Sequence, residues 1–341
     1  MPSAAKDISA AIAAAGGAIS FEKFMELSLY SPNGFYSTIG QAGRRGDFIT
    51  SPEVGPLFGA VVARAIDTRW RELGCPKNFS VIEVGAGPGT FARSVLRADL
   101  ESRAAITYVA VESSSVQRSS HPADVISQAT IPTTPTTGMI IANELLDNLP
   151  FRLFVFDNQW QEAFVVEHDG EFQEVLRKVE DTPDWLPENL QLGTRLPVQR
   201  QAQQWLATSL QILERGSLLI FDYCMTSRIA ATRPWRDWLR TYRQHKPGGH
   251  YLTDSGEQDI TTHLMWDQLE FVSPPSGNSS QSDWLTAHGL TVLVDEGRDY
   301  WQAHASQPDL TAMLMRSRIS EAEALTARDG LGNFRVLEWT K

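Results

Sequence analysis

Cysteine is almost absent from this sequence of 341 residues, which contains only Cys75 and Cys224. Two cysteines far apart in the chain build neither a disulfide framework nor a zinc site, so we expect a reducing compartment and no resident metal. Long apolar runs are also missing, and this argues against a membrane span. The apolar stretch that follows Lys6 and Asp7 does not develop into a signal peptide. These absences predict a cytoplasmic protein.

Basic residues are the second scarce class. The chain has 30 Lys and Arg against 41 Asp and Glu, a formal net charge of −11. An acidic surface repels phosphate backbones, so no nucleic-acid partner is expected. The apolar fraction of 42% and the charged fraction of 21% are ordinary for a globular protein.

Short apolar runs alternate with helical patterns from residue 79 onward. The runs at 81–84, 106–111, 139–142 and 218–221 are typical of buried parallel strands. This alternation predicts an α/β fold with a Rossmann-like doubly wound sheet. Before it, helices are expected near residues 8–15, after an N-cap at Ser20, and from Ser51-Pro52. We therefore predict an N-terminal helical cap with a cofactor-covering loop over residues 1–78, and a main domain over residues 79–341.

Two segments interrupt the main domain. Asp-Asn and Asp-Gly turns separate three alternating runs, which predicts a β-meander insert near residues 151–180. The polar segment at 224–280 is long for a loop and is expected to form a lid-like insert. It carries Arg233, Arg236, Arg240 and Arg243, whose spacing indicates a solvated helix face or a clamp for a carboxylate.

The most informative motif is V-I-E-V-G-A-G-P-G-T at residues 81–90. A buried strand leads to Glu83, and then Gly85, Gly87 and Gly89 turn the chain into a helix. Glycines allow unusual dihedral angles and the close approach of a ligand, which then lies beside the helix N-terminus. The G-x-G-x-G spacing differs from the G-x-G-x-x-G of dinucleotide folds, which disfavours a nicotinamide dehydrogenase. A carboxylate at Glu83 suits the ammonium of S-adenosylmethionine, and Glu112, after the next strand, suits the ribose hydroxyls.

The sequence resembles the MidA-like family of methyltransferases that depend on S-adenosylmethionine. The matching strings are G-D-F-I-T-S-P-E at 46–53, E-V-G-A-G-P-G-T at 83–90, A-N-E-L-L-D-N-L-P at 142–150, F-D-Y at 221–223, D-I-T-T-H at 259–263 and G-N-F-R-V-L at 332–337. The resemblance implies the class I methyltransferase fold with S-adenosyl-L-methionine as cofactor. Together with the glycine motif, it predicts that the cofactor contacts Gly46, Asp47, Thr50, Ser51, Glu53, Glu83, Gly85, Gly87, Gly89, Glu112 and Asn143.

Three residues are candidates for catalysis. Glu144 and Asp147 follow a strand that ends at Ala142, so they are expected at the crevice of the sheet, where two carboxylates could hold a guanidinium group. Alternatively, they only bracket a short helix. His263 could act as a base, although an isolated histidine is more often a structural hydrogen-bonding residue.

The family's activity is arginine methylation of a respiratory complex I subunit. The resemblance therefore implies a protein substrate with an arginine-containing segment, and a homodimer is also expected. Two other hypotheses for the function stay open: methylation of a small molecule, and a cofactor-binding assembly factor whose catalysis is secondary.

Overall fold

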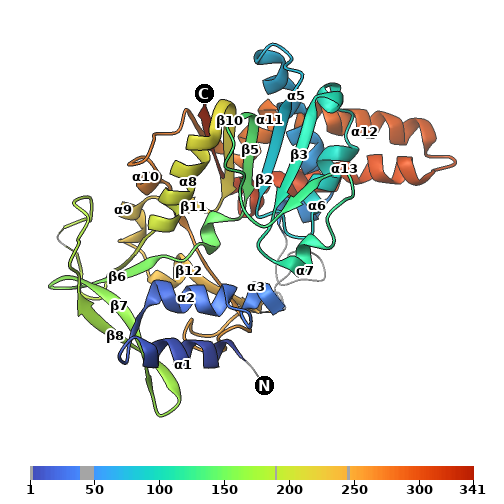
Figure 1. The fold of residues 1–341 in the computed structure, drawn as a ribbon. Helices are drawn as coiled ribbons and strands as arrows, with labels where there is room; N and C mark the ends of the chain where they lie inside the picture. The colour runs from blue at the N-terminus through green and yellow to red at the C-terminus, as the bar shows by residue number, and fades with distance from the viewer. Residues whose placement is uncertain (1–2, 39–49, 189, 244–245) are drawn as a thin grey trace.

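The computed structural model describes residues 3–38, 50–188, 190–243 and 246–341 and shows a mixed α/β protein (Figure 1). A mostly parallel central sheet occupies one part of the molecule. An antiparallel sheet and the N-terminal helices occupy the other. The predicted α/β class is therefore confirmed as a mixed fold with a mostly parallel central sheet.

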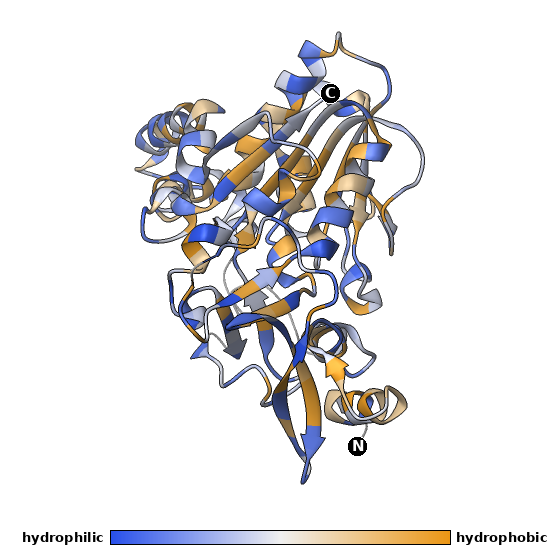
Figure 2. Cartoon of the chain, turned by 90° about the vertical axis from the view of Figure 1, so that its left-hand side faces the viewer, coloured by the Kyte–Doolittle hydropathy of each residue, from blue (hydrophilic) through white to orange (hydrophobic). Residues whose placement is uncertain are grey.

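The central sheet has the strand order β16-β17-β10-β5-β2-β3-β4. The strands from β10 to β4 are parallel neighbours, whereas β17 pairs antiparallel with β10 and β16 pairs antiparallel with β17. In chain order the strands are β2 (Phe79–Val84), β3 (Ile106–Val111), β4 (Ile126–Gln128), β5 (Thr136–Asn143), β10 (Leu213–Asp222), β16 (Gly277–Ser280) and β17 (Arg335–Thr340). The four predicted strands correspond to β2, β3, β5 and β10. They are apolar along their length because helices cover both faces (Figure 2).

Each face of the central sheet has its own apolar core. One face packs on α5 (Pro56–Glu72), α6 (Thr90–Arg97), α11 (Gln281–Ala287), α12 (Leu290–His304) and α13 (Leu310–Thr326). The other packs on α8 (Arg200–Ile212) and α10 (Trp266–Leu269). Short connections contain α7 (Ser115–Arg118), η1 (Glu101–Ala104), η2 (Leu146–Asn148) and η4 (Leu331–Asn333). The α12–α13 hairpin projects from the body at the right of Figure 1.

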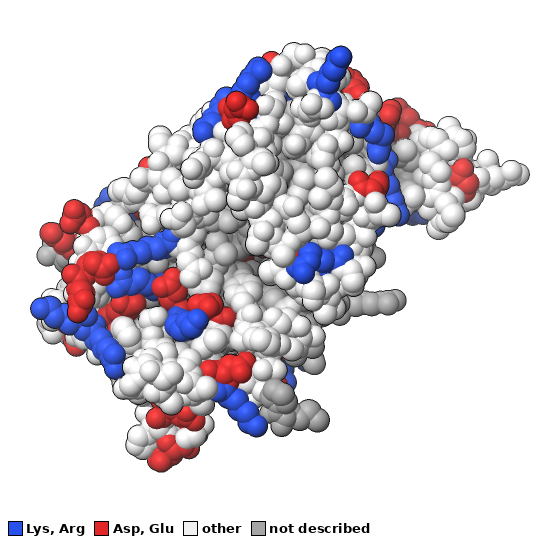
Figure 3. Space-filling model, viewed as in Figure 1, with Lys and Arg blue, Asp and Glu red and all other residues white. Residues whose placement is uncertain are grey.

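The second lobe is built around an antiparallel sheet. Its strands are β1 (Ile19–Ser20), β6 (Arg152–Asp157), β7 (Gln159–His168), β8 (Glu171–Lys178) and β9 (Arg195–Val198). The meander predicted near 151–180 is present as β6, β7 and β8. A third core joins this sheet to α1 (Ala4–Ala14), α2 (Phe21–Tyr30) and α3 (Phe35–Thr38). On the face in Figure 3, charged side chains of both signs gather at the left, over this sheet.

The segment at 224–280, for which the lid-like role stays a prediction, has regular secondary structure of its own. It contains β11 (Cys224–Met225), α9 (Ser227–Ala230), η3 (Trp235–Asp237), β12 (Leu239–Arg243), β13 (Lys246–Pro247), β14 (Asp259–Thr262) and β15 (Leu264–Met265). Trp238 and Tyr251 are fully buried in the core of the second lobe. Arg240 and Arg243 lie on β12, so the predicted helix face is wrong for them. In this segment, polar residues alternate with apolar residues. Many of the apolar residues pack into the core of the second lobe.

The helix predicted from Ser51-Pro52 is divided in two. α4 (Ser51–Val54) ends before Gly55, and α5 begins at Pro56. A proline is tolerated in the first turn of a helix because its missing N–H would be unpaired there. The Glu321 carboxylate of α13 accepts a hydrogen bond from the Leu57 N–H at 2.8 Å, and a Cβ at Gly55 would collide with that carboxyl group.

The domain boundary predicted at residue 78 stays a prediction. α5 lies before that boundary, yet it shares a core with the central sheet. Among the helices of the described ranges, none has the length and apolar character needed to cross a membrane.

Candidate active site

A cavity of about 700 Å³ lies where β2, β3 and β5 end. These are parallel strands, so their carboxyl ends meet at one edge of the sheet, the usual position of a ligand in such folds. The lining residues include Glu83, Gly85, Gly87, Glu112, Asn143 and Glu144. Together with Thr50 and Glu53, eight of the predicted cofactor and catalytic residues are therefore brought to one cavity.

The three predicted glycines form the turn between β2 and α6. Gly85, Gly87 and Gly89 have φ angles of 76°, 52° and 81°, in the left-handed region that side chains disfavour. Gly85 and Gly87 line the cavity. Gly89 instead shapes the turn, because its N–H donates to the Ala86 carbonyl at 2.9 Å.

Glu83 lies at the cavity wall and is only 5% exposed. Burial raises the pKa of its carboxyl to about 8, although a hydrogen bond from the Tyr108 hydroxyl at 2.8 Å opposes the shift. In the part of the chain that the structure describes, no cationic side chain forms an ion pair with Glu83. A buried carboxyl without an ion-pair partner favours the binding of a cation in the cavity.

Glu112 lies at the end of β3 and lines the same cavity. Its carboxylate accepts hydrogen bonds from the backbone N–H groups of Gly87 at 3.0 Å and Ser114 at 2.8 Å. These bonds fix the carboxylate against the glycine turn. The sequence predicted the position of Glu112 but not its contact with Gly87.

A second pocket of about 200 Å³ adjoins the cavity. Glu144 and Asn148 line both spaces, so the two meet at these residues. The second pocket is lined by Glu144, Asp147, Asn148, Tyr223, Trp238, Arg240, Tyr242, Asp259, Thr261, Thr262 and His263. The predicted catalytic residues Glu144, Asp147 and His263 thus share one pocket.

Glu144 has an unusual backbone conformation, with a φ angle of 48°. Such a conformation in a non-glycine residue is strained and is characteristic of functional sites. Its Oε1 accepts hydrogen bonds from the Ser51 N–H at 3.3 Å and from the Asn143 Nδ2 at 3.1 Å. Burial raises the pKa of the Glu144 carboxyl to about 8, and the nearby Asp147 charge adds to the increase.

Two more carboxyl groups lie beside Glu144 in this pocket. Burial raises the pKa of Asp147 to about 6, and a hydrogen bond from the Thr261 hydroxyl at 2.6 Å opposes it. Burial and the Asp147 charge raise the pKa of Asp259 to about 7. The Oδ1 atom of Asp147 is buried without a hydrogen-bond partner among the described residues. Carboxyl groups this close disfavour one another's ionisation, and a cation entering the pocket would relieve that repulsion.

Asp222 stabilises the backbone next to these carboxyl groups. Its Oδ2 accepts hydrogen bonds from the N–H groups of Leu146 at 3.1 Å and Asp147 at 3.3 Å, which fixes the η2 turn. Burial, followed by the charges of Asp147 and Glu144, raises the pKa of the Asp222 carboxyl well above its usual range.

His263 lines the same pocket and lies beside Arg240. The Nη2 atom of Arg240 is 3.1 Å from Nε2 and 3.3 Å from Nδ1 of the imidazole. Burial and the Arg240 charge lower the pKa of His263 to about 4, so the ring is neutral near pH 7. A neutral ring with so low a pKa is a weak proton acceptor, and the geometry favours a role in holding Arg240.

The predicted loop at 46–53 is described only from residue 50. Thr50 and Glu53 line the cavity. The Ser51 hydroxyl donates to Gln281 Oε1 at 3.0 Å, away from the cavity, while its N–H contacts Glu144. Gly46 and Asp47 lie outside the described residues.

Sequence reasoning missed several pocket residues. The Tyr30 hydroxyl donates to the Asn148 carbonyl at 3.0 Å, and the Tyr36 hydroxyl donates to Asp259 Oδ1 at 3.1 Å. Asn148 and Asp259 belong to strings that carry the family resemblance, which is the signal that could have identified them. Tyr30 and Tyr36 reach the site only through tertiary contact. Within the described ranges, no group of three or more His, Cys, Asp or Glu residues could hold a metal ion.

Comparisons with known proteins show which family this chain belongs to. Residues 61–276 match the model of a family of S-adenosyl-L-methionine-dependent methyltransferases. A protein of Burkholderia thailandensis solved with bound S-adenosyl-homocysteine has a TM-score of 0.83 and 26% identity, with coverage of 99% of this chain and 92% of that one. A native structure from the same organism has a TM-score of 0.80 and 25% identity, over 99% and 91% of the two chains.

Two curated relatives are named as mitochondrial protein arginine methyltransferases. The NDUFAF7 homologue of Drosophila melanogaster is 27% identical over 77% of this chain and 68% of its own length. Human NDUFAF7 is 34% identical over 24% of this chain and 19% of its own length. The mitochondrial names conflict with the cytoplasmic location expected from the sequence, and that expectation is wrong. Low cysteine content indicates a reducing environment, which does not specify one compartment.

Proposed function

This chain belongs to the family of S-adenosyl-L-methionine-dependent methyltransferases matched above, and from that premise we propose that it methylates an arginine side chain of a protein substrate. Its methyl donor is S-adenosyl-L-methionine. The arginine specificity is supported by the names of the Drosophila and human relatives and by the chemistry of the second pocket.

The observation that carries the proposal is the group of carboxyls where the two spaces meet. Glu144, Asp147 and Asp259 line the second pocket, and the pKa of each is raised because it is withdrawn from water. A guanidinium group would neutralise this cluster, and its planar array of N–H donors suits bidentate pairing with a carboxylate. Leaving such a cation unpaired away from water would cost several kcal/mol.

The size of the second pocket supports a side-chain substrate. Its volume of about 200 Å³ is below the roughly 300–1,000 Å³ of typical small-molecule sites. A single extended side chain fits such a pocket, while the rest of a protein substrate stays outside it.

The residues of the larger cavity fit the cofactor. Glu83 would hold the ammonium group, because it is a buried carboxyl without an ion-pair partner among the described residues. Gly85 and Gly87 leave the turn open to a close ligand, and Glu112 would accept hydrogen bonds from ribose hydroxyls. Asn143, Thr50 and Glu53 line the same cavity and complete the proposed contacts.

When bound, the cofactor supplies an activated methyl group. The chain itself must orient the accepting nitrogen, exclude water and accept the proton that this nitrogen loses. Glu144 is suited to orient the nitrogen, because it lies at the junction of the two spaces. It is also suited to accept the proton, because its pKa of about 8 is close to neutral pH. Asp147 would share the cationic charge, and Asp222 would position Asp147 through its backbone N–H.

We extend the proposal to the fold. The glycine turn after β2, the order of the parallel strands and the antiparallel β17 support a class I methyltransferase fold. The N-terminal helices would cover the cofactor, since Tyr30 of α2 and Tyr36 of α3 line the cavity.

Labelled cofactor tests the proposal. The protein is incubated with methyl-labelled S-adenosyl-L-methionine and a cell lysate, and the labelled proteins are hydrolysed to amino acids. Label in methylarginine is the expected result. Label confined to small molecules, or to another amino acid, would overturn the arginine assignment. If the Glu144→Gln variant still captures a protein partner but does not methylate it, Glu144 is required for catalysis and not for binding.

A further inference from the structure

Arg240 lines the second pocket and forms no ion pair among the described residues, although its charge lowers the pKa of the nearby Asp147. Its Nε donates to the Asp237 carbonyl at 3.1 Å, and its Nη1 lies 3.4 Å from the Tyr242 hydroxyl. Its Nη2 contacts the neutral His263 ring. All of these groups are uncharged, so no carboxylate contacts the guanidinium directly.

Strand register explains why this cation points inward. β12 and β14 are antiparallel, with Arg240 opposite Thr261 and Tyr242 opposite Asp259. Residues directly opposite each other share a face of the sheet, and alternate residues along one strand do as well. The side chains of Arg240, Tyr242, Thr261 and Asp259 therefore belong to one face, and all four line the pocket.

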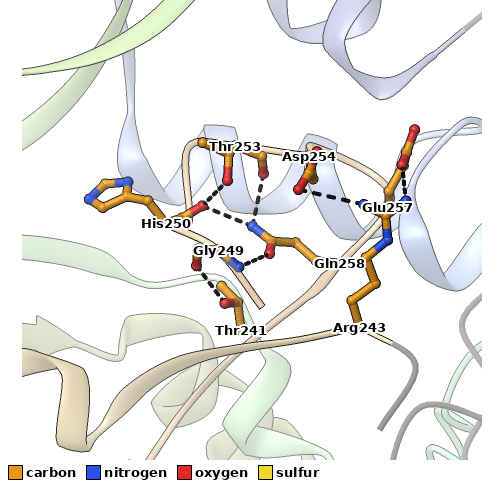
Figure 4. A network of polar contacts seen from close by, with 8 residues as sticks. All are labelled: Thr241, Arg243, Gly249, His250, Thr253, Asp254, Glu257 and Gln258. Atoms are coloured by element: carbon orange, nitrogen blue, oxygen red, sulfur yellow. Dashed lines mark hydrogen bonds and ion pairs between the residues drawn. The ribbon is translucent and has the colours of Figure 1, made fainter. Parts of the chain in front are cut away.

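A polar network holds this pair of strands in place (Figure 4). The Thr241 hydroxyl donates to the Gly249 carbonyl at 2.7 Å, and the Gly249 N–H donates to Gln258 Oε1 at 3.0 Å. The Gln258 amide nitrogen donates to the carbonyls of His250 at 2.9 Å and Thr253 at 2.8 Å. Gln258 immediately precedes Asp259, so the segment at 249–258 is fixed next to the pocket.

The pocket is therefore bipolar. Glu144, Asp147 and Asp259 supply the acidic groups, while Arg240, held by His263, supplies the basic one. An arginine side chain satisfies only the acidic groups. A second cation alone would be repelled by Arg240, whereas a substrate with an adjacent anion would pair with the acidic groups and with Arg240.

We propose that Arg240 is a specificity-determining residue that binds a carboxylate located near the methylated nitrogen of the substrate. The proposal rests on the proposed function and adds to it: the substrate carries a cationic group and a nearby anionic group. The carboxylate could come from an acidic residue that flanks the target arginine or from the α-carboxylate of a small zwitterion. A guanidinium binds either one through paired N–H donors.

The experiment measures binding and methylation with one set of probes. Peptides contain a single arginine and carry Asp, or the isosteric Asn, at each nearby position, and free arginine represents the small zwitterion. Dissociation constants are measured in the presence of S-adenosyl-homocysteine for the wild type, Arg240→Gln and Arg240→Lys. Arg243→Gln is the matched control, because Arg243 lies on the same strand but forms ion pairs with Asp254 and Glu257.

We expect the wild type to bind either one Asp peptide at least 10-fold more tightly than its Asn partner, or free arginine at least 10-fold more tightly than its α-carboxamide. Arg240→Gln should remove that preference, Arg240→Lys should restore part of it, and Arg243→Gln should keep it. Affinity for S-adenosyl-homocysteine should not change.

The outcomes separate this inference from the proposed function. If peptides are methylated but no carboxylate preference depends on Arg240, the inference is overturned and the proposed function stands. If no arginine peptide is methylated but an Arg240-dependent preference is found, the inference stands and the proposed function fails. An equal loss of affinity for all probes in Arg240→Gln would show a structural role only and would also overturn the inference.

Discussion

Glu144 Oε1 accepts a hydrogen bond at 3.3 Å from the backbone N–H of Ser51, a residue 93 positions earlier in the chain. The contact joins the start of α4 to the end of β5, at the junction of the two spaces. Thr50, next to Ser51, lines the larger cavity. The wall of the proposed cofactor site and the orientation of the proposed catalytic carboxyl are therefore connected directly.

Glu144→Gln should lower the rate of methyl transfer by about 100-fold, typical for the loss of a positioned acid–base group. The substitution keeps the shape of the side chain but removes its charge and its ability to accept a proton. Cofactor affinity, measured by calorimetry, should be nearly unchanged because Glu83 and Glu112 remain. A variant that methylates at the wild-type rate would exclude the proposed role of Glu144.

Gly87→Val should abolish binding of S-adenosyl-L-methionine. A side chain at Gly87 would be strained at a φ angle of 52° and would lie beside the cavity. Gly193→Val is the matched control, since Gly193 has a φ angle of 81° and open space around it. Both variants carry backbone strain, but only the first should lose calorimetric binding. Wild-type affinity in Gly87→Val would refute the assignment of the cavity.

The stability of the empty enzyme should fall as the pH rises from 5 to 8. Glu83 has a pKa of about 8 in the folded chain and an ordinary value of 4.5. Its contribution is fully present below pH 4.5, declines while only the unfolded chain ionises, and is lost once the pH passes 8. One such group changes the free energy of unfolding by at most about 1.4 kcal/mol per pH unit.

Urea unfolding at several pH values measures this slope. Glu83→Gln should flatten it, because the amide does not titrate. Glu323→Gln, at an exposed position of α13, is the control and should leave the slope as in the wild type. A slope that Glu83→Gln does not alter would contradict a raised pKa at Glu83.

Glu321→Ala should lower the free energy of unfolding by about 1–3 kcal/mol, the cost of an unpaired buried hydrogen-bonding group. The Glu321 carboxylate accepts the Leu57 N–H at the start of α5 and is only 5% exposed. Glu323→Ala, two residues further along the same helix, should change stability little. Equal effects of the two substitutions in thermal unfolding would show that this contact is not stabilising.

Local sequence patterns predicted much of the central sheet and part of the site. Apolar runs identified β2, β3, β5 and β10 because parallel strands covered on both faces have few polar positions. The glycine turn placed Glu83 and Glu112 at one edge of the sheet. The Ser20 N-cap was also predicted, and its hydroxyl accepts the Lys23 N–H at 3.2 Å.

The second pocket was less predictable, because its wall depends on contacts between distant segments. Tyr36 forms a hydrogen bond with Asp259, which lies 223 positions later in the chain, and no local sequence pattern indicates that contact. The spacing of the arginines suits a helix face, but Leu239 and Thr241 are buried on the other side of β12, and Arg240 projects into the pocket. Tertiary pairing with β14 determined that conformation.

The central claim is that the acidic group at the junction of the two spaces receives a cationic side chain. Calorimetric binding of an arginine peptide at pH 7, with S-adenosyl-homocysteine present and in two buffers of different ionisation enthalpy, measures the protons released. Because the pKa values of Glu144 and Asp259 are about 8 and about 7 in the empty site and a guanidinium would lower both, about one to two protons should be released, and Glu144→Gln should release markedly fewer. Binding without proton release, or equal release by the wild type and Glu144→Gln, would contradict the account.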